Sequence, residues 1–332
     1  MSDRLDHIGR WLQHLFGTSS FVLKPASNDA SFRCYWRVAG DGRTWIVMDA
    51  PPDKEDCRPF IDISRRLFEA GLNVPQVLAY DLEQGLLLLT DLGQDLYLEV
   101  LNPHTVERLY ADAIEQLLIM QRNARIEHLP PYDRERLLEE MELFRVWLLA
   151  RELGVSLDQH QQWMLDRVFT WLADSALTQP QVFAHRDYHS RNLLYTVENN
   201  PGILDFQDAV VGPVTYDLVS LLRDCYIQWP PRRVQAWALH YYQRALASDV
   251  IPELDTKLFL RWFDLMGVQR HLKASGIFAR LWHRDGKPGY LSDVPRTLGY
   301  IIEVSHKYPE LEGLRRLLLE TVLPRLRPPP LS

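Results

Sequence analysis

Polar side chains between residues 187 and 205 have the types and the spacing that phosphoryl transfer requires. Asp187 is followed five positions later by Asn192, and Asp205 comes after two short apolar runs. Transfer of a phosphoryl group needs an aligned acceptor hydroxyl and neutralised phosphate charge, and little covalent chemistry from the protein. Asp187 would orient the hydroxyl or accept its proton. Asn192 and Asp205 offer the hard oxygen ligands that suit Mg²⁺ shared with phosphates.

The residues between these side chains predict how they meet. Two short apolar runs, 193–197 and 203–204, flank the turn sequence Asn-Asn-Pro-Gly. A hairpin of this size returns the chain, so we expect Asp205 to face Asn192 with room for one cation. For any single residue, an Asp or Asn that only caps a turn is the alternative. The combination and spacing favour a functional site.

This stretch resembles a known family. Residues 185–192 match the H-R-D-x-x-x-x-N catalytic loop of protein kinases. Together with residues 203–218 they resemble the aminoglycoside phosphotransferases, small-molecule kinases built on the protein-kinase fold. The resemblance implies ATP as the phosphoryl donor and Mg²⁺ as the cofactor. Asp217 matches a further family aspartate, and a structural role is favoured for it because a carboxylate near a helix start is stabilised by free backbone N–H groups.

Length and composition are those of an ordinary globular protein with material for about two domains. The chain has 332 residues, of which 46% are apolar and 24% charged, and a net charge of −7. This charge argues against bulk nucleic-acid binding. An 18-residue apolar run and a signal-peptide core are both absent, and the three cysteines lack metal-type spacing. We therefore expect a reduced, cytoplasmic, monomeric enzyme with no nucleic-acid or membrane partner.

The apolar pattern predicts the elements that position the site. Strands are expected at residues 21–24, 32–38, 44–48, 76–80 and 86–90, with helices at 2–17 and 55–70. Further helices are expected near 104–123, 133–152, 156–175, 214–227, 231–247, 255–280, 292–306 and 311–323. This order agrees with an α+β, bilobal, protein-kinase-like fold. It predicts a small antiparallel-sheet lobe at 1–91 that binds nucleotide, a hinge at about 91–94, and a large helical lobe at 95–332.

The nucleotide site is predicted from the order of the elements, because neither G-x-x-x-x-G-K-[ST] nor G-x-G-x-x-G occurs. The loop at 25–31 stands where kinases keep a glycine-rich loop, yet it has no glycine. Ser27, Asn28 and Ser31 are candidates to bind phosphate there, and an ordinary polar loop explains them equally well. Backbone groups of Thr90 and Leu92 would face the adenine edge, as in kinase hinges.

Met48 stands where the third kinase strand carries a phosphate-binding lysine. A methionine cannot pair with phosphate, so another cation does so, or Mg²⁺ carries the charge alone. Arg33 and Lys24 on neighbouring strands are the candidate cations. A non-catalytic ATP-binding regulator is an alternative that only Met48 suggests, and the intact catalytic and metal positions argue against it.

The acceptor is predicted from a second resemblance. Residues 48–52 and 269–295 are similar to one bacterial branch of the family, which phosphorylates the anomeric C1 hydroxyl of N-acetylmuramate and N-acetylglucosamine in cell-wall recycling. The resemblance implies that the missing strand lysine is a trait of that branch. The basic residues within 269–287 suit the lactyl carboxylate of N-acetylmuramate, although a solvated helix face would carry the same charges. An aminoglycoside or amino-alcohol kinase is the alternative. The predicted sugar-binding residues are Arg223, Asp224, Arg270, His271 and Lys273.

Overall fold

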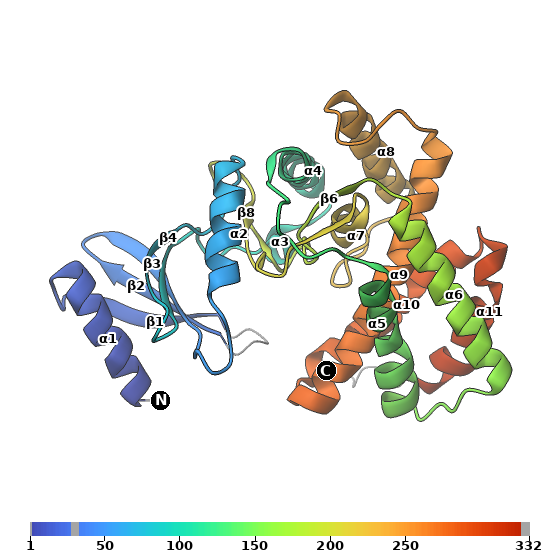
Figure 1. Cartoon of the computed structure of the whole chain (residues 1–332), viewed down its shortest axis with the longest axis horizontal. Helices are drawn as coiled ribbons and strands as arrows, with labels where there is room; N and C mark the ends of the chain where they lie inside the picture. The colour runs from blue at the N-terminus through green and yellow to red at the C-terminus, as the bar shows by residue number, and fades with distance from the viewer. Residues whose placement is uncertain (1, 28–32, 327–332) are drawn as a thin grey trace.

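The N-terminal part of the molecule is a five-stranded antiparallel sheet (Figure 1). The structure, a computed structural model, describes residues 2–27 and 33–326. The sheet has the spatial order β1-β2-β3-β5-β4, and its strands are β1 (Val22–Ser27), β2 (Cys34–Gly40), β3 (Arg43–Asp49), β4 (Val77–Asp81) and β5 (Leu86–Thr90). Helix α1 (Ser2–Phe16) covers one face, and α2 (Arg58–Glu69) stands between the sheet and the helical lobe.

Side-chain alternation along β3 and β5 divides the sheet between two cores. Val47 and Leu88 pack with α1, whereas Met48 and Leu87 belong to the larger core that continues through α2 into the helical lobe. Because both faces of β5 are covered, its run Leu86–Thr90 is apolar almost throughout and shows no alternation. Met48 is completely buried. Its side chain therefore contributes to packing, at the position where the kinase pattern has a phosphate-binding lysine.

The remainder of the chain is mostly helical and is organised around α9. The helices are α3 (Tyr97–Val100), α4 (Val106–Asn123), α5 (Arg134–Leu143), α6 (Gln159–Leu177), α7 (Tyr216–Leu222), α8 (Pro231–Ala247), α9 (Thr256–Asp285), α10 (Val294–Ser305) and α11 (Glu312–Arg316). Segments Phe144–Glu152 and Leu317–Val322 continue α5 and α11 as π-helices, and short 3₁₀ turns lie at Pro288–Asp293, Pro309–Leu311 and Leu323–Arg325. Helix α9 contacts α5, α6, α7, α8 and α10.

Four short strands lie between α6 and α8 and carry the catalytic stretch. β6 (Gln181–Ala184) pairs with β9 (Val210–Pro213), and β7 (Leu193–Leu194) pairs with β8 (Gly202–Ile203), both antiparallel. The loop between β6 and β7 holds the predicted catalytic residues. It is anchored at both ends by strand pairing, which limits its freedom.

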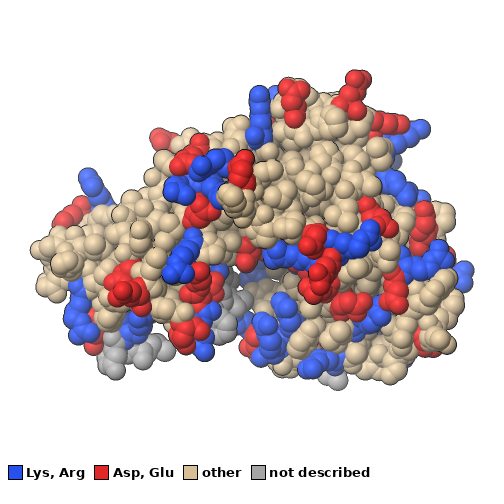
Figure 2. Space-filling model, in the orientation of Figure 1, with Lys and Arg blue, Asp and Glu red and all other residues tan. Residues whose placement is uncertain are grey.

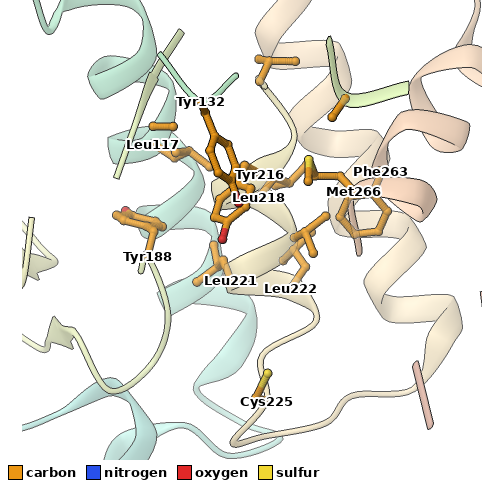
Figure 3. Close-up of a cluster of buried hydrophobic side chains, with 14 of the residues drawn as sticks. Leu117, Tyr132, Tyr188, Tyr216, Leu218, Leu221, Leu222, Cys225, Phe263 and Met266 are labelled. Carbon is orange, nitrogen blue, oxygen red and sulfur yellow. The ribbon is translucent and has the colours of Figure 1, made fainter. Parts of the chain in front are cut away.

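Buried aromatic and aliphatic side chains cluster around α7 (Figure 3). Tyr132 and Tyr216 meet edge to face with ring centroids 5.3 Å apart, and Leu218, Phe263 and Met266 fill the space between α7 and α9. All five are buried. The packing holds α7 rigidly behind the catalytic loop.

Helix α9 also approaches α5 unusually closely. A Cβ atom built on Gly276 would lie 2.2 Å from the carbonyl carbon of Leu143, so only glycine permits this contact. The contact falls where α5 changes to π-helix at Phe144. Near this contact, Nζ of Lys273 on α9 lies 3.3 Å from the carboxylate of Glu140 on α5.

The predicted α+β, bilobal fold with an antiparallel sheet lobe and a larger helical lobe is confirmed. The predicted lobe boundaries and the hinge at about 91–94 stay predictions. One expected helix is shorter than the apolar pattern suggested: α7 ends at Leu222, and Arg223 leaves helical geometry (φ −119, ψ 50). The next residue, Asp224, hydrogen-bonds to the catalytic loop instead.

The surface carries both signs of charge. On the face shown in Figure 2, basic and acidic side chains are intermixed, and the lower edge is indented between the two lobes. Within residues 2–27 and 33–326, no helix combines the length and the apolar character that crossing a membrane requires.

Candidate active site

Asp217 holds the start of the catalytic loop. Its two carboxylate oxygens accept the backbone N–H groups of His185 at 2.7 Å and Arg186 at 2.9 Å. Arg186 has a left-handed backbone (φ 79), which costs a non-glycine residue about 1–2 kcal/mol. The two hydrogen bonds offset this cost and fix the turn that presents Asp187. Burial raises the pKa of Asp217 to about 7, although its two N–H donors act in the opposite direction.

Asp224 holds the middle of the same loop. Its buried carboxylate accepts the backbone N–H of Ser190 at 2.9 Å and that of Tyr226 at 2.8 Å. The end of α7 is therefore tied to the loop a second time. Asp224 was predicted to bind the sugar, and its two oxygens each accept a backbone hydrogen bond.

The predicted hairpin after the loop forms and brings the metal candidates together. Strands β7 and β8 pair, and the backbone N–H of Leu204 donates to the carbonyl of Asn192 at 2.9 Å. Asp205 therefore follows directly after the residue that faces Asn192. The Asn192 side-chain nitrogen donates to the carbonyl of Asp187 at 3.0 Å. This bond leaves Oδ1 of Asn192 as the atom that can bind a cation.

The donor set of this hairpin fits a hard cation shared with phosphate. Asp205 has a half-exposed carboxylate and a left-handed backbone (φ 60), which Asp tolerates better than most residues. Among the described residues, no group of three or more His, Cys, Asp or Glu side chains could hold a metal alone. One carboxylate and one amide oxygen would therefore hold Mg²⁺ only together with the oxygens of a bound phosphate.

Asp187 presents an ionised carboxylate to the surface. Its side chain is 42% exposed, and Nε2 of His189 lies 4.0 Å from Oδ1. Loss of hydration raises the pKa of the carboxyl, but nearby positive charge, first that of Lys273 and also that of Arg270, outweighs this and lowers the pKa to about 2. Burial lowers the pKa of His185 to about 4, so this neighbouring ring is neutral.

Lys273 belongs to a buried ionic cluster beneath the loop. Its Nζ lies 3.3 Å from Glu140 and 3.0 Å from the Tyr216 hydroxyl. Arg186 and Tyr132 also hydrogen-bond to the Glu140 carboxylate. Burial raises the pKa of Glu140, but Lys273 and Arg186 outweigh it and hold the pKa below its ordinary value. The positive charge of Lys273 is therefore balanced by the negative charge of Glu140 inside the protein.

Arg270 and His271 are also buried. Arg270 donates to Sγ of Cys225 at 3.5 Å, and its charge acts on both Asp187 and Asp224. The His271 ring donates to the Arg223 carbonyl at 2.9 Å and stacks on Tyr300 with centroids 4.8 Å apart. Burial, followed by the charge of Arg270, lowers the pKa of His271 to about 3. His271 is therefore neutral.

Arg223 faces a different cavity. Its guanidinium lies 2.5 Å from Asp264, and it lines a pocket of about 190 Å³ together with Trp229 and Lys307. The described catalytic and metal candidates do not line this pocket. All five residues predicted to bind sugar are buried, and their contact with a sugar stays a prediction.

Arg33, which lies just before β2, connects the sheet lobe to Asp205, the residue that follows Leu204 after the β7–β8 hairpin. Its guanidinium lies 2.5 Å from Glu55 and 3.6 Å from Asp205, and the side chain is only 8% exposed. Its partner Glu55 comes just before α2, and the sequence analysis did not identify it. Kinases pair a strand lysine with a helix glutamate near the phosphates. Arg33 and Glu55 form an ion pair of the same charge types, from different positions in the chain.

The segment that follows β5 is clamped by Arg37. This arginine of β2 donates to Asp91 at 2.7 Å and to the Gly93 carbonyl at 2.8 Å. Thr90 exchanges hydrogen bonds with Gln76, through its backbone N–H (3.0 Å) and its hydroxyl (2.9 Å). Arg37 gave no signal in the sequence, because an outward arginine on a strand resembles any surface charge.

The structure describes fewer contacts for the other residues predicted to bind nucleotide. Leu92 is half-buried and packs against Gly202 of β8, where an added Cβ would lie 3.1 Å from its side chain. Ser27 is the last residue of β1. Asn28 and Ser31 lie outside the described residues, as does the side chain of Ser27. The phosphate contacts predicted for this loop stay predictions.

Solved structures share the fold at low sequence identity. An ethanolamine kinase of Plasmodium vivax matches with a TM-score of 0.62 at 12% identity, over 84% of this chain and 82% of that one. An aminoglycoside phosphotransferase, APH(4)-Ia, matches with a TM-score of 0.61 at 13% identity, over 93% of this chain and 99% of that one. These likenesses show the protein-kinase-like fold of small-molecule kinases.

Sequence relatives are far more similar. A protein of Pseudomonas putida is 50% identical over 298 residues, which is 90% of this chain and 88% of that protein. A protein of Neisseria meningitidis is 43% identical over 318 residues, which is 94% of each. Both are named N-acetylmuramate/N-acetylglucosamine kinase.

A family model covers most of the chain. Residues 22–289 match the model described as the phosphotransferase enzyme family, which spans the sheet lobe, the catalytic stretch and α9. The match confirms the resemblance drawn from residues 185–192 and 203–218. The chain belongs to the phosphotransferase enzyme family.

Proposed function

We propose that this protein is an ATP-dependent kinase that phosphorylates the C1 hydroxyl of N-acetylmuramate and of N-acetylglucosamine. The observation that carries the proposal is the exposed, ionised Asp187 beside the hairpin that joins Asn192 to Asp205. The name of relatives at 43% and 50% identity supports the choice of sugar. The product would be a sugar 1-phosphate in peptidoglycan recycling, made in the cytoplasm.

Asp187 would orient the acceptor hydroxyl. With a pKa of about 2 it is a weak base, so it accepts the proton only as the oxygen loses it in the transition state. An anomeric hydroxyl is more acidic than an ordinary alcohol, which suits a weak base. His185 and Arg186, fixed by Asp217, keep the carboxylate in place.

Asn192 and Asp205 would hold Mg²⁺, which would neutralise the negative charge of the phosphates. Arg33 would add a positive charge beside the phosphates, because its guanidinium already lies 3.6 Å from Asp205. Glu55 keeps the guanidinium in position. This pair would replace the lysine that is absent at Met48.

The sheet lobe would bind ATP next to these groups. Backbone groups of Thr90 and Leu92 are proposed to contact the adenine edge, since Arg37 holds Asp91 and Gly93 of the same segment. Ser27, Asn28 and Ser31 are proposed phosphate contacts on the loop between β1 and β2. The bound partners are therefore small molecules, and a monomer suffices for this chemistry.

Product analysis tests the proposal directly. The protein is incubated with ATP, Mg²⁺ and, separately, N-acetylmuramate, N-acetylglucosamine, kanamycin and choline, and products are examined by phosphorus NMR. Phosphate is expected on C1 of both sugars, and a C1 methyl glycoside is expected to be inert while a C6-blocked sugar reacts. Phosphate on C6, or preference for kanamycin or choline, would refute the proposal in favour of the other kinases of this fold.

A further inference from the structure

Glu140, on α5, has no part in the proposed chemistry, yet it contacts the residue that precedes the catalytic carboxylate. Its side chain is only 12% exposed. One carboxylate oxygen accepts a hydrogen bond from Arg186. The other accepts one from the Tyr132 hydroxyl and lies 3.3 Å from Nζ of Lys273. The carboxylate of Glu140 therefore faces two cations at once.

The packing of α5 against α9 brings Glu140 and Lys273 together. Leu143 and Gly276 form the close contact between the two helices. Glu140 lies three residues before Leu143, and Lys273 lies three residues before Gly276, which is close to one helical turn in each case. Nζ of Lys273 also donates to the Tyr216 hydroxyl at 3.0 Å. The ion pair is thus a product of helix packing and not of local sequence.

Lys273 keeps its charge inside the protein. Burial lowers the pKa of its ammonium group, but the carboxylate of Glu140 outweighs burial and holds the pKa above its ordinary value. Among the positive charges that lower the pKa of Asp187, that of Lys273 is the largest. Lys273 is therefore attracted by two carboxylates, and its contact is with Glu140.

Asp187 keeps a carboxylate that a ligand can reach. Its side chain is 42% exposed, and in the part of the chain that the structure describes it forms no ion pair with a lysine or an arginine. Arg186, its neighbour in the sequence, directs Nη2 to Glu140 and Nη1 to the Asp208 carbonyl at 3.4 Å. The Arg186 guanidinium also lies over the Tyr132 ring, 5.6 Å from the centroid. Both cations are thus directed to Glu140, and Asp187 is left for the acceptor.

Without Glu140, Lys273 would be drawn to Asp187. A lysine carries a compact charge on a flexible four-carbon stem, so its ammonium group can change partner. A buried charge that loses its partner is strongly unfavourable, which favours such a change. An ammonium group paired with Asp187 would then occupy the oxygens that the acceptor hydroxyl needs.

We propose that Glu140 is a positioning residue that draws Lys273 and Arg186 away from Asp187 and so keeps the catalytic carboxylate open to the acceptor hydroxyl. The inference rests on the proposed function, because the acceptor is the sugar hydroxyl that Asp187 orients. Glu140 acts through the two cations and does not touch the substrate. Its loss therefore affects turnover as well as the stability that a buried ion pair provides.

Steady-state kinetics with N-acetylglucosamine tests this assignment. This sugar lacks the lactyl carboxylate, so a contact of Lys273 with that group does not enter the comparison. Glu140→Gln is expected to lower kcat about ten- to hundredfold, within the range for an impaired general base, with KM for ATP near the wild-type value. Glu140→Gln/Lys273→Met removes the competing cation as well, and it should recover most of the lost turnover.

Asp264→Asn is the matched control. Asp264 is another buried carboxylate that faces an arginine, a lysine and a tyrosine hydroxyl, and it lines the pocket that the described catalytic and metal candidates do not line. These partners are Arg223 at 2.5 Å, Lys307 at 3.0 Å and Tyr308 at 3.0 Å. Both single variants should unfold at a lower temperature than the wild type. Turnover per folded molecule, counted by calorimetric ATP binding, should fall in Glu140→Gln and not in Asp264→Asn.

The outcomes separate this inference from the proposed function. Wild-type turnover per folded molecule in Glu140→Gln, or a loss that Lys273→Met does not recover, would overturn the role of Glu140 while the proposed function stands. If Glu140→Gln does not fold, Glu140→Asp, which withdraws the carboxylate by one methylene and keeps its charge, is compared with Glu140→Asp/Lys273→Met by the same two criteria. A wild-type protein that phosphorylates neither sugar would overturn the proposed function and the inference together.

Discussion

Asp205 and Asp217 come from the same stretch of sequence, yet the structure gives them different surroundings. Asp205 follows the β7–β8 hairpin, its side chain is 39% exposed, and it lies near Arg33. Asp217 is 1% exposed, and both of its oxygens accept backbone N–H groups of the catalytic loop. One carboxylate is placed where a cation and a phosphate can reach it. The other is used to fix the loop.

Position relative to the site separates the basic residues. Arg33 is only 8% exposed, but its guanidinium lies 3.6 Å from Asp205, a predicted metal ligand. Lys273 and Arg270 are buried, and their positive charge lowers the pKa of Asp187. A buried charge needs a partner, and removing one member of a buried pair is strongly destabilising. We therefore expect substitutions facing the ligands to reduce turnover and substitutions beneath the loop to reduce stability.

The largest expected effect is that of Asp187→Asn. Loss of the hydroxyl-orienting carboxylate should lower kcat about 10²–10⁴-fold, while the affinity for ATP and the thermal unfolding midpoint stay near wild type because the side chain is 42% exposed. Turnover with N-acetylmuramate, calorimetric ATP binding and thermal unfolding check this. A variant that retained more than about a tenth of wild-type turnover would remove Asp187 from its proposed role.

The second largest expected effect is that of Arg33→Met. We expect kcat/KM for ATP to fall about ten- to hundredfold, because a charge-assisted contact to phosphate is lost. Arg4→Met is the matched control, since Arg4 pairs with Asp49 in the same lobe at 2.5 Å and lies at no proposed ligand site. Kinetics with varied ATP measure both. Equal losses in the two variants would mean that Arg33 only stabilises the lobe.

Asp217→Asn tests whether the buried carboxylate stabilises the fold. Asparagine offers one acceptor oxygen in place of two, so one N–H of His185 or Arg186 loses its partner, and the free energy of unfolding should fall by about 1–3 kcal/mol. Asp205→Asn is the control, with an expected change within about 0.5 kcal/mol for an exposed site. Chemical denaturation measures both. Equal stability losses would contradict the assigned division of roles.

Asp217 should make the unfolding free energy of the wild-type protein fall as the pH rises. Burial raises the pKa of Asp217 from its ordinary 3.8 to about 7, so the folded state binds the proton more tightly than the unfolded chain. The contribution of Asp217 to the free energy of unfolding is fully present below 3.8, the pKa of this group in the unfolded chain. It is lost as the pH rises through about 7. Asp217→Asn has no such group, so its unfolding free energy should fall less steeply than that of the wild type between about pH 4 and 7.

The smallest effect concerns the acid limb of the pH–rate profile. Because Asp187 has a pKa of about 2, its protonation should not limit kcat/KM of the wild type near neutral pH. Lys273→Met removes the largest charge that lowers this pKa, so the acid limb should move to higher pH. Lys307→Met is the control, because Lys307, like Lys273, pairs with a carboxylate, that of Asp264 at 3.0 Å. The same shift in both variants would contradict the role of Lys273.

The sequence alone determined the local geometry of the site and the class of the fold. Asn192 and Asp205 meet through a hairpin whose turn and strands lie entirely between them, so local chemistry decides their approach. The five strands and most helices follow the apolar periodicity, because each buries one face or both. Asp187 was identified from its spacing to Asn192, since both lie on the same short loop.

Tertiary structure decided which charges are exposed and which are matched. The basic residues of α9 predicted sugar contacts by charge alone, but packing of α9 against α5 and α7 buries Lys273 and Arg270. The pairs Arg33–Glu55 and Arg37–Asp91 and the stacking of Arg191 on Tyr226 and Tyr290 join residues from separate elements. A residue's type specifies which partners it can have. The fold alone specifies which of them lies within reach, because these contacts depend on the packing of distant segments and leave no local pattern in the sequence.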